Sequence, residues 1–374
     1  MNAPEAFDAV MVDLYRRNAA VLPNGTQWFD AHTHTGQNDP DGMRATADEI
    51  LAGLDVVGHS QALVFTTMEP DGYPAANDRV IAEAAGSAGR LHALARLDPH
   101  DTPVAEAERC LDAGAVGLKL HPRAEHFALH DGGIDDIVRL ADERRLPIVI
   151  HAGRGIPALG RDTVELATRY PGARLILAHA GISDLAWIWR EAEHLPNLFF
   201  DTAWWLVADL LALFAHVPPG HILYASDMPY GHPVFNGLAL IRCGLAVGLA
   251  PDVLAQIAGG HLEHLMAGGE PRDLGPAPGP PTVAPPASAP RVVQHLVAAA
   301  SRVMADADPT EPLALARLSC AVPEDDPEHE LLALAARLIA NAESHVGGLP
   351  QSRRQVAGPS VAGALIAGTP SVPV

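Results

Sequence analysis

Cysteine is scarce in this chain, and its few cysteines lie far apart. Only 3 of the 374 residues are cysteines, Cys110, Cys243 and Cys320, and no two of them form a C-x-x-C pair. Disulfide scaffolds and thiolate zinc sites both depend on closely spaced pairs of cysteines. The sequence therefore argues against both, and any bound metal would need imidazole and carboxylate ligands.

Positive charge is also scarce. The chain carries 25 lysines and arginines against 45 aspartates and glutamates, which is a formal net charge of −20 with histidine neutral. Proteins that bind nucleic acids or anionic membranes do so through clustered cationic side chains. We therefore expect no nucleic-acid partner and no membrane partner.

Long hydrophobic runs are absent from the first 267 residues. The most apolar stretch there is 206–217, and Asp209 and His216 interrupt it. A transmembrane helix needs about 20 consecutive apolar residues, and the acidic N-terminal segment lacks the features of a signal peptide. We therefore expect a cytoplasmic protein whose 48% hydrophobic residues suffice for a large core.

The chain does contain a repeated pattern of short aliphatic runs, each followed by a polar loop and an amphipathic stretch. This pattern is typical of βα units joined by right-handed crossovers. Eight units favour a closed (β/α)8 TIM barrel, and no G-x-G-x-x-G motif of a dinucleotide-binding fold follows the first run. The expected strands are 28–34, 61–67, 91–97, 116–121, 147–151, 174–179, 197–202 and 221–227.

Composition divides the chain into four expected regions. Residues 1–270 should form the barrel, and 271–290, where 8 of 20 residues are proline, should be an extended linker. Residues 291–345 have aliphatic residues at helical spacing, which predicts a small helical hairpin packed as an appendage. The Gly-, Pro- and Ala-rich segment 346–374 is expected to be a flexible tail.

The 19 histidines are the most informative feature, because several fall where strands should end. The first strand ends Asp30-Ala-His-Thr-His34, and side chains alternate across a strand, so His32 and His34 should both face the barrel lumen. The carboxyl ends of the strands form the active-site face of such barrels. Imidazoles and a carboxylate converging there predict a divalent metal site, with zinc as the first candidate. The other polar residues at expected strand ends are Lys119, His121, His151, His179 and Asp227.

Further side chains near the expected strand ends could contact a substrate. Arg96, Arg123 and Arg154 could each bind a carboxylate bidentately, or could instead form salt bridges that close loops. Trp204 could line an apolar pocket, and Tyr230 lies on the last loop of the active-site face. We therefore expect a small-molecule substrate, with a carboxylate among the candidates, and we allow for a homo-oligomer.

The stretches WFDAHTH, GLKLHP, IVIHAG, LILAHAG and YASDMPYG, spread over residues 27–267, resemble the amidohydrolase superfamily. The order H-x-H, His, His, Asp is most similar to the amidohydrolase-2 branch, which is related to aminocarboxymuconate-semialdehyde decarboxylase. The resemblance implies a metal-dependent TIM barrel. It does not extend to the proline-rich segment or to the helices that follow.

The resemblance also implies roles for individual residues. His32, His34, His151 and Asp227 would hold one metal ion, and His179 would transfer protons beside it. In an alternative assignment, Lys119 is carboxylated and bridges two ions. One departure is His261 in Gly259-Gly-His261, where related proteins usually have asparagine.

Three functions remain open. The first is hydrolysis of a small amide, lactone or ester by a metal-activated water, with Asp227 accepting the proton and His179 orienting the water or the carbonyl. The alternative is non-oxidative decarboxylation of an unsaturated or aromatic acid at the same site, where the metal and an arginine would hold the substrate and His179 or Asp227 would transfer protons. For either reaction, Lys119 is a further candidate catalytic residue and His121 a candidate substrate contact. The third is a non-catalytic scaffold whose C-terminal helices bind a partner.

Overall fold

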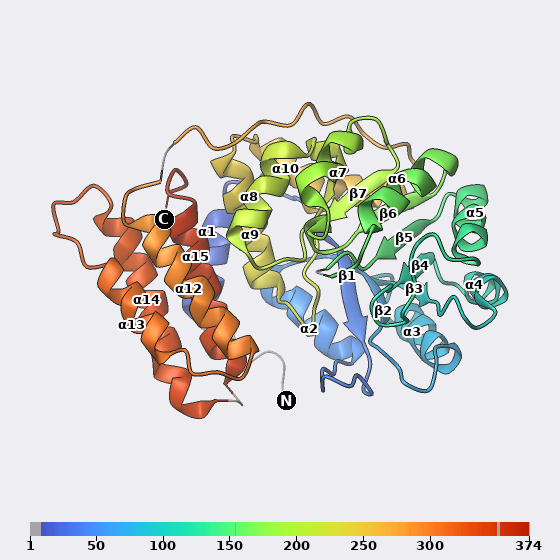
Figure 1. Ribbon diagram of the computed structural model, residues 1–374, viewed down its shortest axis with the longest axis horizontal. Helices are drawn as coiled ribbons and strands as arrows, with labels where there is room; N and C mark the ends of the chain where they lie inside the picture. The colour runs from blue at the N-terminus through green and yellow to red at the C-terminus, as the bar shows by residue number, and fades with distance from the viewer. Residues whose placement is uncertain (1–8, 154, 284, 350–351, 374) are drawn as a thin grey trace.

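Eight parallel strands, hydrogen-bonded in sequence order, form the centre of the protein (Figure 1). The structure is a computed structural model and describes residues 9–153, 155–283, 285–349 and 352–373. The predicted TIM barrel is confirmed, with one strand at each expected position. The strands are β1 (Phe29–Thr35), β2 (Gln61–Thr66), β3 (Leu91–Arg96), β4 (Gly117–Leu120), β5 (Pro147–Ile150), β6 (Arg174–Leu177), β7 (Leu198–Asp201) and β8 (Ile222–Leu223).

Helices alternate with the strands and cover the outside of the barrel (Figure 1). Their starts follow local signals: Thr46, for example, forms a capping box with Glu49 at the first helix after β1. The helices of this region are α1 (Ala9–Ala19), α2 (Ala47–Val57), α3 (Pro74–Gly86), α4 (Pro103–Asp112), α5 (Ile134–Arg144), α6 (Leu159–Arg169), α7 (Leu185–Ala192), α8 (Val207–His216), α9 (Pro233–Ala246), α10 (Pro251–Ala258) and α11 (Gly260–Met266).

A register shift in β1 decides which of its side chains face the lumen. Between Asp30 and Thr33 the pairing with β2 slips. Phe29 and Ala31 belong to the apolar cluster inside the barrel, whereas His34 lies opposite Phe65 of that same cluster. The extra residue of this bulge reverses which alternate side chains face the lumen. Apolar side chains face it in the first part of the strand, and the histidines face it in the last part.

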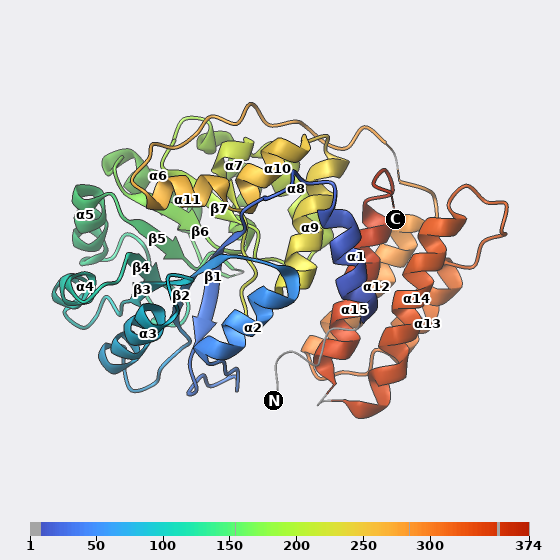
Figure 2. The ribbon, with the colours of Figure 1, turned by 180° about the vertical axis from the view of Figure 1, so that it is seen from behind.

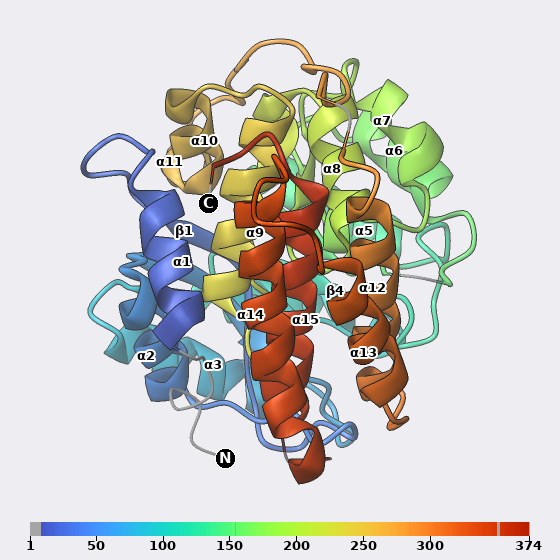
Figure 3. The same cartoon turned by 90° about the vertical axis from the view of Figure 1, so that its left-hand side faces the viewer.

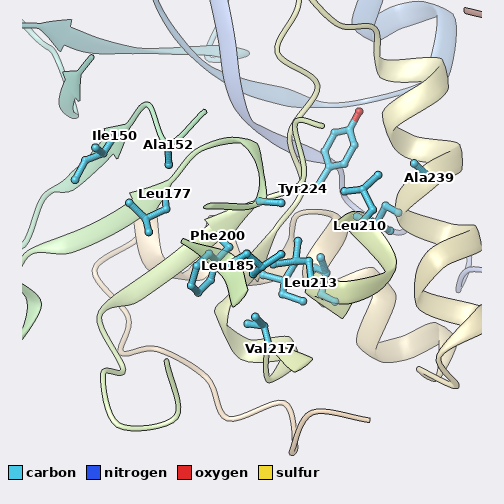
Figure 4. Packing of buried hydrophobic residues seen from close by; sticks show 14 of the residues in the cluster. Ile150, Ala152, Leu177, Leu185, Phe200, Leu210, Leu213, Val217, Tyr224 and Ala239 are labelled. Carbon is cyan, nitrogen blue, oxygen red and sulfur yellow. The ribbon is translucent and has the colours of Figure 1, made fainter. Parts of the chain in front are cut away.

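The barrel closes where β1 meets the chain that follows β8. The backbone N–H of Ala31 donates to Tyr224 O (2.9 Å), and that of His34 donates to Met228 O (2.7 Å). Outside the barrel, apolar side chains of the strands pack against the helices, as Phe200 of β7 and Leu213 of α8 show in Figure 4. The strands are thereby buried on both faces, as expected for a parallel sheet.

The end of the barrel opposite the predicted site is closed by α11 and the segment after it. Arg174, at the start of β6, donates to the carbonyl oxygens of Leu265 and Gly269. His261 is fully buried there, beside Phe199, and accepts a hydrogen bond from the backbone N–H of Arg272 (3.1 Å). The departure from asparagine at this position is therefore a change in the floor of the barrel, away from the predicted metal ligands.

The C-terminal part is larger and more ordered than the sequence predicts. Instead of a hairpin and a flexible tail, it forms four helices: α12 (Ala289–Met304), α13 (Thr310–Ser319), α14 (His329–His345) and α15 (Arg353–Gly368). The expected tail is wrong for residues 353–368, since α15 packs against α12 and α14 within the bundle (Figure 3). Between 271 and 283 the chain has neither helix nor strand and runs along the barrel (Figure 2).

Small residues explain why α15 is hard to recognise in the sequence. Its stretch from Ala357 to Gly368 contains four alanines and three glycines and few large apolar residues, so helical periodicity is faint. The same small residues let α15 lie close to its neighbours: a side-chain carbon at Gly363 would come within 2.8 Å of Leu296 of α12. Burial in this narrow space, rather than intrinsic helix propensity, stabilises α15.

Arg242 of α9 ties the end of α15 to the barrel. Its guanidinium is fully buried and donates to Thr369 Oγ1, Thr369 O, Val372 O and Pro373 O at 2.9–3.0 Å, and to Asn18 Oδ1 of α1 at 3.2 Å. A cation at the carboxyl end of a helix is also favoured by the helix dipole. The bundle is therefore anchored on α9 by polar as well as apolar contacts. Among the described residues, no helix is long and apolar enough to cross a membrane.

Candidate metal centre

At the carboxyl end of the barrel, His32 and His34 of β1 meet Asp227, which follows β8. The Nε2 atoms of the two imidazoles lie 3.1 Å apart. Asp227 Oδ1 lies 3.3 Å from His32 Nε2 and 3.0 Å from His34 Nε2. The three donor atoms all fall within 4.8 Å of one another, which is compact enough for one metal ion. The structure thus brings together three of the four predicted ligands.

Asp201, at the end of β7, contacts the His32 ring on the side opposite to Asp227. Its Oδ2 lies 2.8 Å from His32 Nδ1, and its Oδ1 accepts the backbone N–H groups of His179 (2.8 Å) and Ala203 (3.0 Å). A carboxylate on Nδ1 selects the tautomer of His32 that turns the Nε2 lone pair toward Asp227. We did not single out Asp201 from the sequence, although its place at the end of a strand, like that of Asp227, was a usable signal.

The electrostatics of the site favour neutral imidazoles. Burial, followed by the charge of Lys119, lowers the pKa of His32 and of His34 well below the usual 6.5. Burial raises the pKa of Asp227 to about 6 and that of Asp201 to about 7. Neutral imidazoles keep a lone pair for a metal, and a carboxyl group with a pKa near neutrality can exchange protons.

The residues present fit a divalent cation. Two imidazole nitrogens and a carboxylate oxygen are ligands that zinc and manganese both accept. Without a cation, the lone pair of His32 Nε2 would face Asp227 Oδ1 at 3.3 Å, and the single proton of His34 Nε2 would have to serve both of these acceptors. A divalent ion is therefore the group that the chemistry of His32, His34 and Asp227 suits.

His151, the fourth predicted ligand, is separated from this group by His179. Its Nδ1 is 3.0 Å from His179 Nε2, and its ring stacks on His121 with centroids 3.8 Å apart. His179 connects the two sets, because its ring centroid lies 5.2 Å from that of His32. Within the described residues, His151 Nε2 is buried without a hydrogen-bond partner. The assignment of His151 as a metal ligand stays a prediction.

Lys119 of β4 is fully buried among the same side chains. Its Nζ lies 4.6 Å from the ring centroid of Phe65, which in turn packs edge-on against His34. Among the described residues, Nζ has no hydrogen-bond partner. Burial, with a further contribution from Arg96, lowers the pKa of Lys119 to about 7.

Arg96 is already paired within the protein. Its guanidinium donates to Glu125 Oε1 (2.7 Å) and to Thr66 O (3.3 Å), lies over the ring of Tyr73 and is 2% exposed. Tyr73 also donates to Glu125 Oε1 (2.5 Å). Of the two interpretations left open by the sequence, the structure shows the salt bridge that closes loops, here between β3 and the β2–α3 and β4–α5 loops.

The other predicted substrate contacts differ in position. Arg123 is exposed, and Arg154 lies outside the described residues. Trp204 Nε1 donates to Asp209 Oδ2 (2.7 Å), while its ring lies 6.0 Å from that of His179. Tyr230 packs edge-on against His34, with centroids 5.1 Å apart, and is 39% exposed. Trp204 is thus an aromatic neighbour of His179, and Tyr230 is one of His34, a predicted metal ligand.

Comparisons with known proteins agree with this geometry. The sequence profile described as "Amidohydrolase" matches residues 29–260. The chain belongs to the amidohydrolase family. The match spans the barrel and its site residues and ends before the proline-rich segment. A comparison with curated protein sequences finds no match.

Several solved structures share the barrel at low sequence identity. One is 2,6-dihydroxybenzoate decarboxylase from Rhizobium, with a TM-score of 0.52, 16% identity, and coverage of 64% of this chain and 98% of that one. A second is 5-carboxyvanillate decarboxylase from Sphingomonas paucimobilis, with a TM-score of 0.51, 16% identity, and coverage of 65% of this chain and 99% of that one. A third is the dihydroxybenzoic acid decarboxylase from Polaromonas sp. JS666, solved with bound manganese and 2-nitroresorcinol. Its TM-score is 0.53 at 15% identity, with coverage of 64% of this chain and 97% of that one.

The sequence profile establishes the family, and the solved structures establish the fold. Each neighbour is covered almost completely, so about a third of the present chain has no counterpart in them. Family membership makes this protein an enzyme of the amidohydrolase type, which removes the non-catalytic scaffold from consideration. Its substrate and reaction have to be inferred from the site itself.

Proposed function

We propose that this protein is a metal-dependent, non-oxidative decarboxylase of an aromatic or unsaturated carboxylic acid. Hydrolysis is the reaction that the sequence predicts first, and decarboxylation was the alternative. We prefer decarboxylation because of the buried ammonium group of Lys119. This group has no hydrogen-bond partner among the described residues and lies beside the predicted metal ligands.

An unpaired buried cation is costly unless an anion neutralises it. A substrate carboxylate would supply that anion and would hold Lys119 in its protonated form. Phe65, Trp204 and Tyr230 surround the histidines with flat apolar faces, which suit a planar acid. That three similar structures are decarboxylases of aromatic acids supports the same choice.

The residues of the chain can perform the proton transfer that decarboxylation needs. The bond between the ring or vinyl carbon and the carboxylate breaks, carbon dioxide leaves, and the electron pair on carbon takes up one proton. Asp227, whose pKa is raised to about 6 by burial, and His179, 4.0 Å from it, are placed to deliver this proton. A divalent ion held by His32, His34 and Asp227 would polarise the substrate and withdraw charge from the reacting carbon.

The test is to identify the product. Purified protein loaded with zinc or with manganese is incubated in D₂O with 2,6-dihydroxybenzoate, 5-carboxyvanillate and related acids. We expect carbon dioxide and a product carrying one deuterium at the former carboxyl position. Asp227→Asn should abolish this reaction, and Asp135→Asn, at a surface pair on α5, should not.

Hydrolysis is the second candidate, because the raised pKa of Asp227 also suits a base that accepts a proton from water. Amide, lactone and ester substrates are therefore assayed beside the acids. Water addition without carbon dioxide release would reverse the order of the two candidates.

Metal analysis tests the site independently of any substrate. The wild type should retain about one equivalent of a divalent ion, or two if Lys119 is carboxylated. His32→Ala combined with His34→Ala should lose it, and His329→Ala, at an exposed histidine at the start of α14 in the C-terminal bundle, should retain it. Full occupancy in the double variant would contradict the assigned ligands. Competition between zinc and manganese then decides which ion the protein prefers, zinc being our first candidate.

A further inference from the structure

The C-terminal bundle contacts the loop that carries Asp227. Arg354, in the first turn of α15, lies outside residues 29–260, which match the family. Its Nη2 nevertheless donates to the carbonyl oxygen of Pro229 at 2.6 Å. Pro229 lies two residues after Asp227 and one before Tyr230, in the loop that joins β8 to α9.

This loop is a tight turn whose parts cannot move separately. The N–H of Gly231 donates to Asp227 O (2.7 Å), which closes a turn around Pro229. The N–H of Asp227 donates to His32 O (2.9 Å) and ties the start of the turn to β1. A displacement of the Pro229 carbonyl therefore shifts Asp227 relative to the histidines.

The turn also contains a strained residue. Asp227 has φ = 58°, in the left-handed region that non-glycine residues rarely adopt. Such a conformation persists only when surrounding contacts hold it. The loop therefore depends on hydrogen bonds from outside, of which the Arg354 contact is one.

Arg354 is well placed to supply such a contact. Among the described residues, the guanidinium of Arg354 takes part in no ion pair, whereas that of the adjacent Arg353 pairs with Asp306 of the bundle. The side chain is partly buried, and its charge lies close enough to His232 to add to the lowering of that pKa, which burial dominates. His232 caps α9 at the other end of the same loop.

The far end of α15 is fixed as well. Arg242, in the third turn of α9, holds the chain just after α15 through Thr369, Val372 and Pro373. Helix α15 therefore runs alongside α9 in the same direction and is attached at both ends of it. Attachment at both ends keeps the Arg354 guanidinium in a constant position relative to the β8–α9 loop.

We propose that Arg354 is a positioning residue that holds Asp227 in its metal-binding position, so that the C-terminal bundle completes the active site. This inference rests on the proposed metal site. It gives the bundle a role in the enzyme's own reaction and requires no binding partner.

Three full-length variants test the inference. Arg354→Met removes the hydrogen-bond donor, Arg354→Lys retains one donor and the charge, and Arg353→Met is the matched control at the adjacent position. The readouts are zinc and manganese affinity by chelator competition, amide hydrogen exchange over 226–232, and thermal unfolding.

We expect Arg354→Met to bind either metal about tenfold more weakly, as at other residues that orient metal ligands. Exchange over 226–232 should become faster in this variant, Arg354→Lys should recover much of both properties, and Arg353→Met should match the wild type. Thermal unfolding verifies that each variant is folded.

Unchanged metal affinity and unchanged exchange in Arg354→Met would overturn the inference. So would equal losses in Arg354→Met and Arg353→Met, since these would reflect the bundle's stability and not the contact with Pro229. If the wild type itself bound no metal, the proposed function would fail, and the exchange data alone would then decide whether Arg354 orders the loop.

Discussion

The barrel and the C-terminal bundle treat buried polar groups in opposite ways. Among the described residues, every buried side-chain nitrogen or oxygen that lacks a hydrogen-bond partner belongs to the barrel, including Lys119 Nζ, Glu125 Oε2 and His151 Nε2 near the metal site. The bundle has an apolar core of its own, in which residues such as Leu296 and Leu332 are fully buried. Where the two parts meet, Arg242 is satisfied by five hydrogen bonds.

Unpaired buried polar groups reduce stability, and proteins retain them where they serve a function. We therefore expect the residues at the carboxyl end of the barrel to serve catalysis and those at the junction with the bundle to serve stability. Substitutions in the two places should separate these properties.

Arg242→Met should cause the largest loss of stability. It leaves three backbone carbonyls and a hydroxyl at the end of α15 without their buried donor, which should lower the free energy of unfolding by about 3–4 kcal/mol. Urea denaturation measures this loss. Arg317→Met removes an exposed pair with Glu343 in the bundle and should cost about 0.5 kcal/mol. Similar losses in the two variants would remove the distinction between junction and surface.

Asp201→Asn should weaken metal binding about a hundredfold, which is about 2.7 kcal/mol. The new amide can still accept from the backbone of His179 and Ala203. Its NH₂ group would face His32 Nδ1, so the imidazole proton would move to Nε2 and block the lone pair intended for the metal. Chelator competition measures the affinity, and urea denaturation should show little change. Metal binding equal to the wild type would mean that Asp201 does not set the tautomer.

His261→Asn should change how stability depends on pH. Burial lowers the pKa of His261 to about 4, below the 6.5 of the free side chain. The native state therefore binds fewer protons than the unfolded state, so this contribution is present above pH 6.5 and is lost as the pH falls toward 4.

Asparagine does not titrate, so the loss of the hydrogen bond from Arg272 shifts the stability by the same amount at every pH. The metal-free variant should lose about 2 kcal/mol less than the wild type between pH 6.5 and 4. Urea denaturation at several pH values measures the difference, and parallel curves for the two proteins would exclude the effect.

Lys119→Met should have the smallest effect on stability and still abolish turnover. Replacing a buried, unpaired ammonium by an apolar side chain of similar length should leave the free energy of unfolding within about 1 kcal/mol of the wild type, or raise it. Thermal unfolding and product analysis measure the two properties. A strongly destabilised variant would show that Lys119 supports the fold, and the contrast between barrel and bundle would weaken.

The barrel and much of its site could be predicted from local patterns. Each aliphatic run was followed by a polar residue at a strand end, and parallel strands place such ends on one face of the barrel. His32, His34 and Asp227 were identified in this way. Asp201 follows the same rule, because it ends β7, and the same signal could have identified it.

Other features depend on partners that are distant along the chain. Whether Arg96 would bind a substrate or close a loop was decided by Glu125, which the sequence places 29 residues away. The ordering of 353–368 depends on a narrow space between α12 and α14, because small residues gain stability only when neighbours approach closely. Neither outcome follows from local periodicity.

Strand alternation and strand ends are local properties, so the barrel, its active face and the predicted kind of metal ligand could all be read from the sequence alone. The tertiary structure alone decided the bulge that turns His32 and His34 inward, the tautomer set by Asp201, and the contact of Arg354 with Pro229. These depend on register and on contacts across more than a hundred residues, where small differences in packing energy decide between arrangements that local sequence leaves equal.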